Sequence, residues 1–233
     1  FTLYSACQSA PTSGTINLTM YELPLFPLET VLFPGMPIHL HIFEPRYREM
    51  LNRCITLDQP FGVVLIRRGV EAGGPPAEPH AIGCAARVSR VEHLEDGRMN
   101  LTALGEERFR ILGLSRARAY LVGQVESLPI AHPCSLDMQR GGRQLLPWVH
   151  RYLELVSRLD PENELDLREL QLPEDPLMLS YLSAMLLQLP PLEKQPLLEA
   201  PDGLTLLHAV LRLVRREATV LAHAPGVEKA ELN

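Results

Sequence analysis

The segment from Leu23 to Leu51 limits the possible folds of this chain more than any other segment; it reads LPLFPLETVLFPGMPIHLHIFEPRYREML. Three prolines interrupt its apolar residues, at Pro24, Pro27 and Pro34. Proline has no N–H group and a fixed φ, so it is found at sheet edges and at strand ends. We therefore expect residues 22–33 to form a bent edge strand, or two short strands, rather than a central strand.

The pattern changes twice after these prolines. Pro34-Gly35 indicates a turn. Apolar and polar residues then alternate over 38–42, which is the period of a strand with one buried face. Glu44 and Pro45 indicate the start of a helix, because proline at the first helical position loses no hydrogen bond.

Strand-like runs continue to about residue 125. The expected segments are a central strand at 61–66, a loop at 69–79, and strands at 82–91, 99–112 and 120–125. Asp96-Gly97 predicts a type I′ hairpin turn, in which both central residues have positive φ. About six mostly antiparallel strands joined by short turns would hide their edges by curling into a barrel.

The apolar spacing becomes helical from about Met138. An acidic, proline-containing connector is expected at 154–175, and helices at 176–188, 191–199 and 203–221. The predicted fold class is therefore α+β. Its expected parts are a flexible tail at 1–20, a β-barrel at 21–128, a helical bundle at 137–222 and a C-terminal tail at 223–233.

Composition excludes several classes of protein. The 233 residues are 46% hydrophobic, as in an ordinary globular protein, with 28 acidic against 22 basic residues and a net charge of −6. Affinity for a phosphate backbone needs a basic surface, so a general nucleic-acid binder is disfavoured. The four cysteines form no CxxC pair, which argues against a metal site and fits a reducing, cytoplasmic compartment. No apolar run reaches the roughly 20 residues of a membrane span, and no secretory signal is visible.

Five motifs occur in order along the chain. They are LPLFPLETVLFPG with IFEPRYREML, then FGVVLI, IGCAARV, DGRMNLTALGEERFRI and EKQPLLE. Together they resemble the substrate-binding N-terminal domain of the Lon protease family, over roughly residues 22–221. The resemblance implies a PUA-like β-barrel followed by a helical bundle, and a role in recognising protein substrates.

The catalytic modules of a full Lon enzyme are not recognisable in this sequence. The phosphate-cradling motif GxxxxGK[ST] is absent. The only lysines are Lys194 and Lys229, and neither has a context that suits a Ser–Lys dyad. His39 and His41 share a strand face but have no third metal ligand, so we favour a pair of surface histidines. We expect no enzyme activity, no cofactor and no metal.

Two charged groups favour structural roles. Glu44, Arg46 and Tyr47 could form an acid–base cluster, but we favour Glu44 as a helix cap and Arg46 as an ion-pair partner of Glu49. Seven arginines between residues 87 and 118 are interspersed with five acids, so we expect cross-strand ion pairs rather than a nucleic-acid surface. These arginines are Arg87, Arg90, Arg98, Arg108, Arg110, Arg116 and Arg118.

The expected function is non-catalytic binding of unfolded or client proteins, with an adaptor role toward a protease machine in trans. Exposed apolar side chains beside a proline-interrupted strand could hold such segments by hydrophobic contact or by strand addition. The candidate contact residues are Leu28, Val31, Phe33 and Phe43. For each of them, an ordinary place in the core is the competing interpretation.

Two other functions remain open at this point. The first is a small-molecule- or RNA-binding barrel, because PUA-like folds also host nucleic-acid contacts; the acidic net charge weighs against RNA. The second is a hydrolase of unrecognised type. Steady turnover that is lost on changing one residue would establish it.

Overall fold

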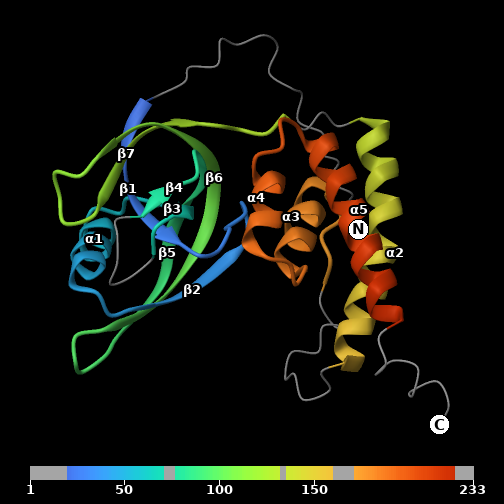
Figure 1. Ribbon diagram of the computed structural model, residues 1–233, viewed down its shortest axis with the longest axis horizontal. Coiled ribbons are helices and arrows are strands. Elements are labelled where there is room, and N and C mark those ends of the chain that lie inside the picture. The colour runs from blue at the N-terminus through green and yellow to red at the C-terminus, as the bar shows by residue number, and fades with distance from the viewer. Residues whose placement is uncertain (1–19, 71–76, 132–134, 160–170, 224–233) are drawn as a thin grey trace, which may run out of the picture.

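A computed structural model of the chain describes residues 20–70, 77–131, 135–159 and 171–223. The N-terminal half forms a β-barrel with one helix, and the C-terminal half is helical (Figure 1). This confirms the predicted α+β class, with a mostly antiparallel sheet followed by helices. Nearly all of the predicted tails, half of the predicted acidic connector (160–170) and part of the 69–79 loop (71–76) lie outside the described residues.

The barrel half contains β1 (Met20–Leu28), β2 (Pro37–Ile42), α1 (Pro45–Thr56), β3 (Phe61–Arg68), β4 (Glu78–Pro79), β5 (Ile82–His93), β6 (Met99–Ser115) and β7 (Leu121–Ser127). The helical half contains α2 (Leu136–Leu159), α3 (Pro176–Leu186), α4 (Pro191–Leu198) and α5 (Gly203–Ala222). Helix α2 therefore continues into the segment that was expected to be a connector.

Five strands close the barrel in the order β1–β7–β6–β5–β3, and β3 pairs back with β1. The closing β1–β3 pair is parallel, whereas the other pairs in the ring are antiparallel. Strands β2 and β4 lie outside the ring, on β6 and β3 respectively. Closure gives every strand of the ring two neighbouring strands.

Residues 22–33 were predicted to form a bent edge strand or two short strands; β1 ends at Leu28 and is a member of the closed ring, but each of its halves has one neighbouring strand. It pairs with β7 as far as Leu25 and with β3 from Leu25 onward. Pro24 lies in the first half of β1 and Pro27 in the second, so each proline has one side without a paired strand. The missing N–H groups are tolerated on those sides.

The turn between β5 and β6 also differs from the prediction. Gly97 has φ +79°, but Asp58 is the one non-glycine residue with positive φ among the described residues, so Asp96 does not adopt the type I′ conformation. The N–H of Gly97 donates to the carbonyl of Leu94 (3.0 Å), and that of Leu94 donates to the carbonyl of Arg98 (2.9 Å). This is a longer hairpin loop that ends in a glycine bulge.

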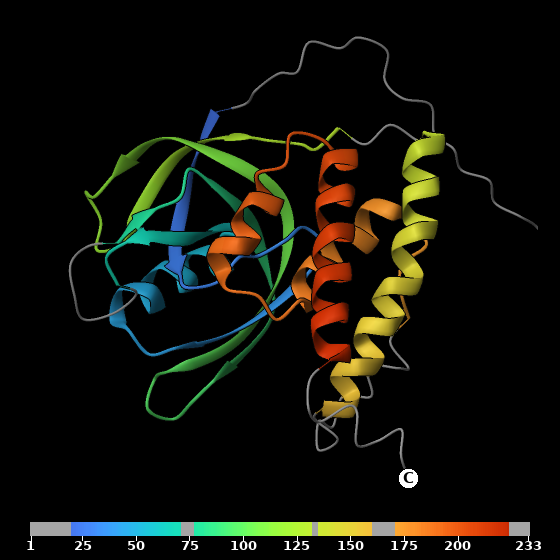
Figure 2. The same cartoon turned by 45° about the vertical axis from the view of Figure 1, so that its right-hand side comes forward.

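The barrel and the helices share one large hydrophobic core. Phe33, in the connection between β1 and β2, is fully buried, and its ring centroid lies 5.9 Å from that of Tyr181 in α3. Helices α3 and α4 lie nearer the barrel than α2 (Figures 1 and 2). We refer to the contact zone around Phe33 as the junction.

A buried arginine also links the two halves. Arg108 of β6 is 3% exposed, and its guanidinium donates to the carbonyls of Leu128 (3.2 Å), Leu198 and Ala200 (both 2.7 Å). The last two carbonyls lie at the end of α4 and just beyond it. Burial lowers the pKa of this guanidinium. Arg108 is therefore a buried residue that connects the barrel to the helical half by hydrogen bonds. It is not one of the surface arginines that the sequence suggested.

Candidate functional site

The structure separates the four predicted contact residues. Leu28, Val31 and Phe33 are buried in the core, whereas the side chain of Phe43 is 55% exposed. A protein that contacts this conformation from outside can reach only Phe43. The competing interpretation as core residues therefore holds for the other three.

Phe43 directly follows β2, a strand that has one open edge along its whole length. Strand β2 pairs with β6 from Pro37 opposite Leu104 to Ile42 opposite Met99, and none of the described strands pairs with its other side. Strand β4 also has one neighbour, but it has only two residues and the second is proline. A short edge that carries proline resists pairing, so β2 offers a more accessible edge than β4.

The ladder between β2 and β6 determines which main-chain groups of β2 are available. The carbonyl of Met36 accepts the N–H of Gly105 (2.9 Å). Hydrogen-bonded pairs alternate along an antiparallel ladder, so the even-numbered residues of β2 bond to β6. The N–H and C=O groups of His39 and His41 consequently point toward the open side.

The outer face of β2 carries the two histidine side chains. His39 Nδ1 lies 3.0 Å from Thr102 Oγ1, and His41 Nδ1 lies 2.7 Å from Asn100 Oδ1. The amide oxygen can only accept, so Nδ1 of His41 donates to it. Nε2 of His41 is then free to accept from Arg98 Nη1 at 3.3 Å.

These side chains line a shallow hollow of ≈ 460 Å³ over β2, β6 and β5. Arg90 and Glu92 of β5 complete its polar lining, and Glu92 accepts a hydrogen bond from Asn100 Nδ2 (3.3 Å). The ring of Phe43 stacks on that of His41, with centroids 6.3 Å apart. We refer to the open β2 edge, this hollow and Phe43 together as the edge surface.

Sequence reasoning found His39, His41 and Phe43 but missed the other residues of the edge surface. Thr102 and Asn100 stand opposite the two histidines, and Arg90 and Glu92 stand opposite Thr102 and Asn100. Their alternating polar pattern was visible in the sequence. Their assembly on one face depends on the pairing register, which residue spacing alone does not specify.

The described residues offer little for catalysis or metal binding. They contain no group of three or more histidine, cysteine, aspartate or glutamate side chains that could hold a metal. Burial raises the pKa of the Cys54 thiol to about 11 and raises that of Cys84 as well, so both thiols are poor nucleophiles. Lys194 Nζ donates to the carbonyl of Met185 (2.9 Å), and burial lowers its pKa.

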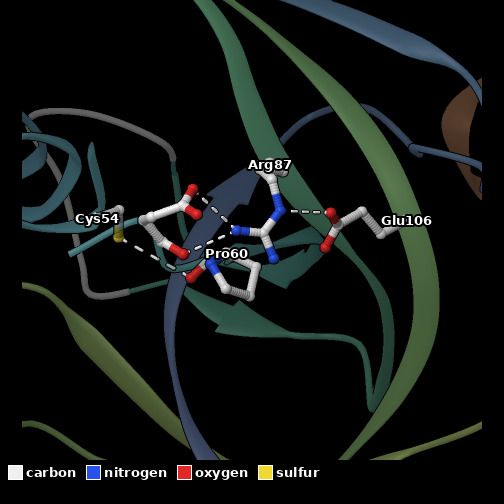
Figure 3. Close-up of polar contacts among 5 residues, drawn as sticks. Cys54, Pro60, Arg87 and Glu106 are labelled. Carbon is white, nitrogen blue, oxygen red and sulfur yellow. Dashed lines mark hydrogen bonds and ion pairs between the residues drawn. The ribbon is translucent and has the colours of Figure 1, made fainter. Parts of the chain in front are cut away.

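Several predicted ion pairs are present. Arg87 binds Glu106 across the β5–β6 pair (2.6 Å), and it also donates to the main-chain carbonyl of Asp58 (2.7 Å; Figure 3). Arg110 pairs with Glu126 of β7 (3.0 Å). These contacts confirm the cross-strand interpretation for two of the arginines.

The start of α1 differs in detail from the prediction. Glu44 occupies the N-cap position, but its side chain makes no capping hydrogen bond. It forms an ion pair with Arg46 (2.9 Å), where the sequence predicted Glu49 as the partner. The guanidinium of Arg46 also lies over the ring of Tyr47, 4.5 Å from its centroid.

Comparison with known proteins identifies close similarity to one family. Residues 22–216 match the family model of the ATP-dependent protease La (LON) substrate-binding domain. The chain is 31% identical over 215 residues to a Lon protease of Paraburkholderia phytofirmans and 25% identical over 209 residues to Lon protease 2 of Syntrophobacter fumaroxidans. These matches cover 90% and 89% of this chain but 26% of each relative, so the chain spans about a quarter of their length.

Two solved structures share the fold. A Lon N-terminal domain protein from Xanthomonas campestris has a TM-score of 0.57 at 26% identity, over 82% of this chain and 98% of that one. The N-terminal domain of a Mycobacterium avium complex Lon protease has a TM-score of 0.60 at 17% identity, over 84% of this chain and 98% of that one. No helix among the described residues is long and apolar enough to span a membrane.

Proposed function

The chain belongs to the ATP-dependent protease La (LON) substrate-binding domain family, and we propose that it binds segments of unfolded or client proteins through the edge surface, without catalysing a reaction. The observation that carries the proposal is the exposed Phe43 next to the open edge of β2. An exposed aromatic ring beside unpaired main-chain groups offers both apolar contact and hydrogen bonds to an extended chain.

The absence of catalysis is part of the proposal. The family match concerns a substrate-binding domain, and this chain covers only 26% of the length of a relative that carries the Lon protease name. The raised thiol pKa values of Cys54 and Cys84 give further support. Within this proposal the domain acts in the cytoplasm, as an adaptor that presents clients to a protease in trans.

RNA binding has less support. The net charge is −6, and Arg87, Arg98 and Arg110 each form an ion pair with a nearby acid. A phosphate backbone would have to displace those acids.

Fluorescence anisotropy with a labelled, permanently unfolded protein tests the proposal. We expect the wild-type chain to bind it and Phe43→Asp to weaken binding by about tenfold, since the loss of a buried aromatic contact costs about 1–2 kcal/mol. Leu192→Asp is the matched control, because Leu192 is 66% exposed on α4, a helix that contributes no residue to the lining of the hollow. Equal effects of the two substitutions would contradict the assigned surface.

A labelled RNA provides the competing arm of the experiment. The proposed function fails if the wild-type chain does not bind the unfolded protein. It also fails if the chain binds RNA with a steep salt dependence and shows no affinity for protein.

A further inference from the structure

We propose that a small pocket between the start of α1 and the turn from β6 to β7 binds a phosphoryl dianion, either free phosphate or the phosphate group of a small phosphorylated compound. The proposal does not depend on the function assigned to the edge surface. It follows from the size of the pocket, the charge of its lining and the way its arginine side chains are held.

The pocket is small and its lining is largely polar. Its volume is ≈ 190 Å³, and its lining includes the first turn of α1, a proline of β1 and the turn that joins β6 to β7. Sites for drug-sized ligands occupy about 300–1,000 Å³, so this pocket suits a small ion or a single functional group. The lining residues that carry the argument are Arg46, Tyr47, Arg116, Arg118 and Tyr120.

The lining carries positive charge that no described acid neutralises. Three of the lining residues are arginines and none is an acid. Arg46 forms an ion pair with Glu44 (2.9 Å). Arg116 and Arg118, by contrast, form no ion pair with an acid among the described residues. Two guanidinium charges therefore remain, which match a phosphate group that carries nearly two negative charges at neutral pH.

Two of the guanidinium groups rest on tyrosine rings. Arg46 lies over Tyr47, 4.5 Å from the ring centroid, and Arg118 lies over Tyr120, 5.9 Å from its centroid. Both rings are fixed in the core, with 4% and 3% of their surface exposed. A guanidinium that stacks through its face keeps its N–H groups for hydrogen bonds in its own plane. Arg118 is therefore held in place before an anion arrives, which lowers the entropy lost on binding.

The hydroxyl of Tyr120 adds a neutral donor beside these charges. It accepts a hydrogen bond from Nη1 of Arg118 (3.2 Å), and its own proton has no acceptor among the described residues. Arg116 donates only one hydrogen bond, from Nη2 to the carbonyl of Ala77 (3.4 Å). A guanidinium has five N–H donors, so most of those on Arg116 and Arg118 remain for phosphate oxygens.

A nucleic-acid backbone fits this pocket less well than a single phosphate group. Binding of RNA needs a basic surface that contacts several phosphates in a row. The chain has a net charge of −6, and Arg110, the preceding arginine on β6, is paired with Glu126 (3.0 Å). The unneutralised charge in the lining is confined to Arg116 and Arg118, which is enough for one dianion.

Nuclear magnetic resonance of the ¹⁵N-labelled chain tests the proposal. Inorganic phosphate is titrated while sodium chloride keeps the ionic strength constant, and the arginine Nε–Hε signals report on each guanidinium. The signals that are missing from Arg116→Gln and Arg118→Gln identify these two residues. We expect both signals to shift and to saturate at millimolar phosphate. Each of the two variants should bind phosphate at least about tenfold more weakly, because a charge-assisted hydrogen bond is lost.

Two further variants separate the pocket from general surface charge. Arg140→Gln removes the same charge from α2, where the Arg140 side chain is 70% exposed, and should change the affinity by less than about twofold. Tyr120→Phe keeps the ring under Arg118 and removes only the hydroxyl, so it should weaken binding at least about threefold. Circular dichroism verifies that each variant is folded.

Three outcomes would overturn the proposal. The first is a set of signal shifts that chloride reproduces at the same ionic strength. The second is an equal loss of affinity in Arg118→Gln and Arg140→Gln. The third is a labelled RNA that binds the wild-type chain and no longer binds Arg118→Gln, which would assign the pocket to nucleic acid.

The chain's own carboxylate is a further competitor. Glu71 is the only acid in the segment 71–76, which lies outside the described residues between Val70 and Ala77 of the lining. A Glu71→Gln variant that binds phosphate at least about tenfold more tightly would overturn the proposal, because Glu71 would then be the ligand of these arginines. We expect a change of less than about threefold.

Glycerol 3-phosphate distinguishes the two sources of the phosphoryl group. Tighter binding of this compound than of inorganic phosphate would support a small phosphorylated compound as the ligand. Weaker binding would support free phosphate. Failure of both to bind would overturn the site and leave the function assigned to the edge surface unaffected.

Discussion

Phe33 and Phe43 lie on one connected segment, yet they belong to regions with opposite properties. Phe33 is fully buried in the junction, close to Tyr181, whereas Phe43 is 55% exposed on the edge surface. Near the junction, three main-chain carbonyls accept hydrogen bonds from the buried guanidinium of Arg108, although the buried hydroxyl of Tyr181 has no hydrogen-bond partner among the described residues. The edge surface leaves the main-chain groups of His39 and His41 unpaired within the described sheet.

Strand β6 belongs to both regions. Its first residues pair with β2 and form the hollow, and Arg108, further along, ties the barrel to the end of α4. The difference teaches that, under the proposed function, stability and binding depend on different parts of one strand. Substitutions at the junction should act on the free energy of unfolding, and those at the edge surface on affinity.

The largest expected difference between the regions comes from truncating the two phenylalanines. Phe33→Ala should lower the free energy of unfolding by about 3–5 kcal/mol, because it opens a cavity in a packed core. Phe43→Ala should change it by less than about 0.5 kcal/mol, as for other surface positions. Urea denaturation of both variants measures the difference. Decreases of similar size in the free energy of unfolding would contradict the contrast between the junction and the edge surface.

Removal of the buried arginine should have the next largest effect. Arg108→Met keeps most of the packing but leaves the carbonyls of Leu128, Leu198 and Ala200 without this donor, which should cost about 2–4 kcal/mol. Arg110→Met is the matched control, since Arg110 is 48% exposed and its ion pair with Glu126 is worth at most about 1 kcal/mol. Equal melting temperatures for the two variants would show that the hydrogen bonds of Arg108 do not stabilise the contact between the barrel and the helices.

A pair of glycines in β6 should give a smaller difference. A Cβ at Gly105 would collide with the main-chain carbonyl oxygen of Phe33, so Gly105→Ala should destabilise by about 1–3 kcal/mol. At Gly113 the nearest atom to a new Cβ is 3.8 Å away, and Gly113→Ala should cost no more than about 0.5 kcal/mol. Thermal unfolding measures the stability of both variants. A Gly105→Ala variant that is as stable as wild type would mean that the junction is loosely packed.

The smallest effect is expected for an exposed ion pair on the barrel wall. Arg87 contacts Glu106 and Asp58, but its side chain is 41% exposed, so solvent screens the interaction. Arg87→Ala should lower the free energy of unfolding by less than about 1 kcal/mol, and added salt should reduce the difference further. A larger decrease in the free energy of unfolding that does not depend on salt would show that Arg87 acts like a buried stabilising residue.

Local sequence patterns predicted most of the secondary structure. The strands at 61–66 and 82–91 and the helices that begin at Pro176, Pro191 and Gly203 follow from periodicity and from proline and glycine positions. These signals act over a few residues, so they do not depend on the rest of the fold. The turn at Asp96-Gly97 was recognised as a hairpin, although its type depended on the length of the loop between the paired strands.

The sequence by itself determined the order of the elements, the family and the absence of recognisable catalytic motifs. Only the tertiary structure decided that β1 changes partners at Leu25 to close the ring, that Arg108 is buried, and that Phe43 is exposed while Phe33 is not. The physical reason is that burial depends on contacts between segments distant in the chain. The alternating residues after Pro37 place Phe43 on the same face as His39 and His41. No local signal, however, tells whether another segment covers that face.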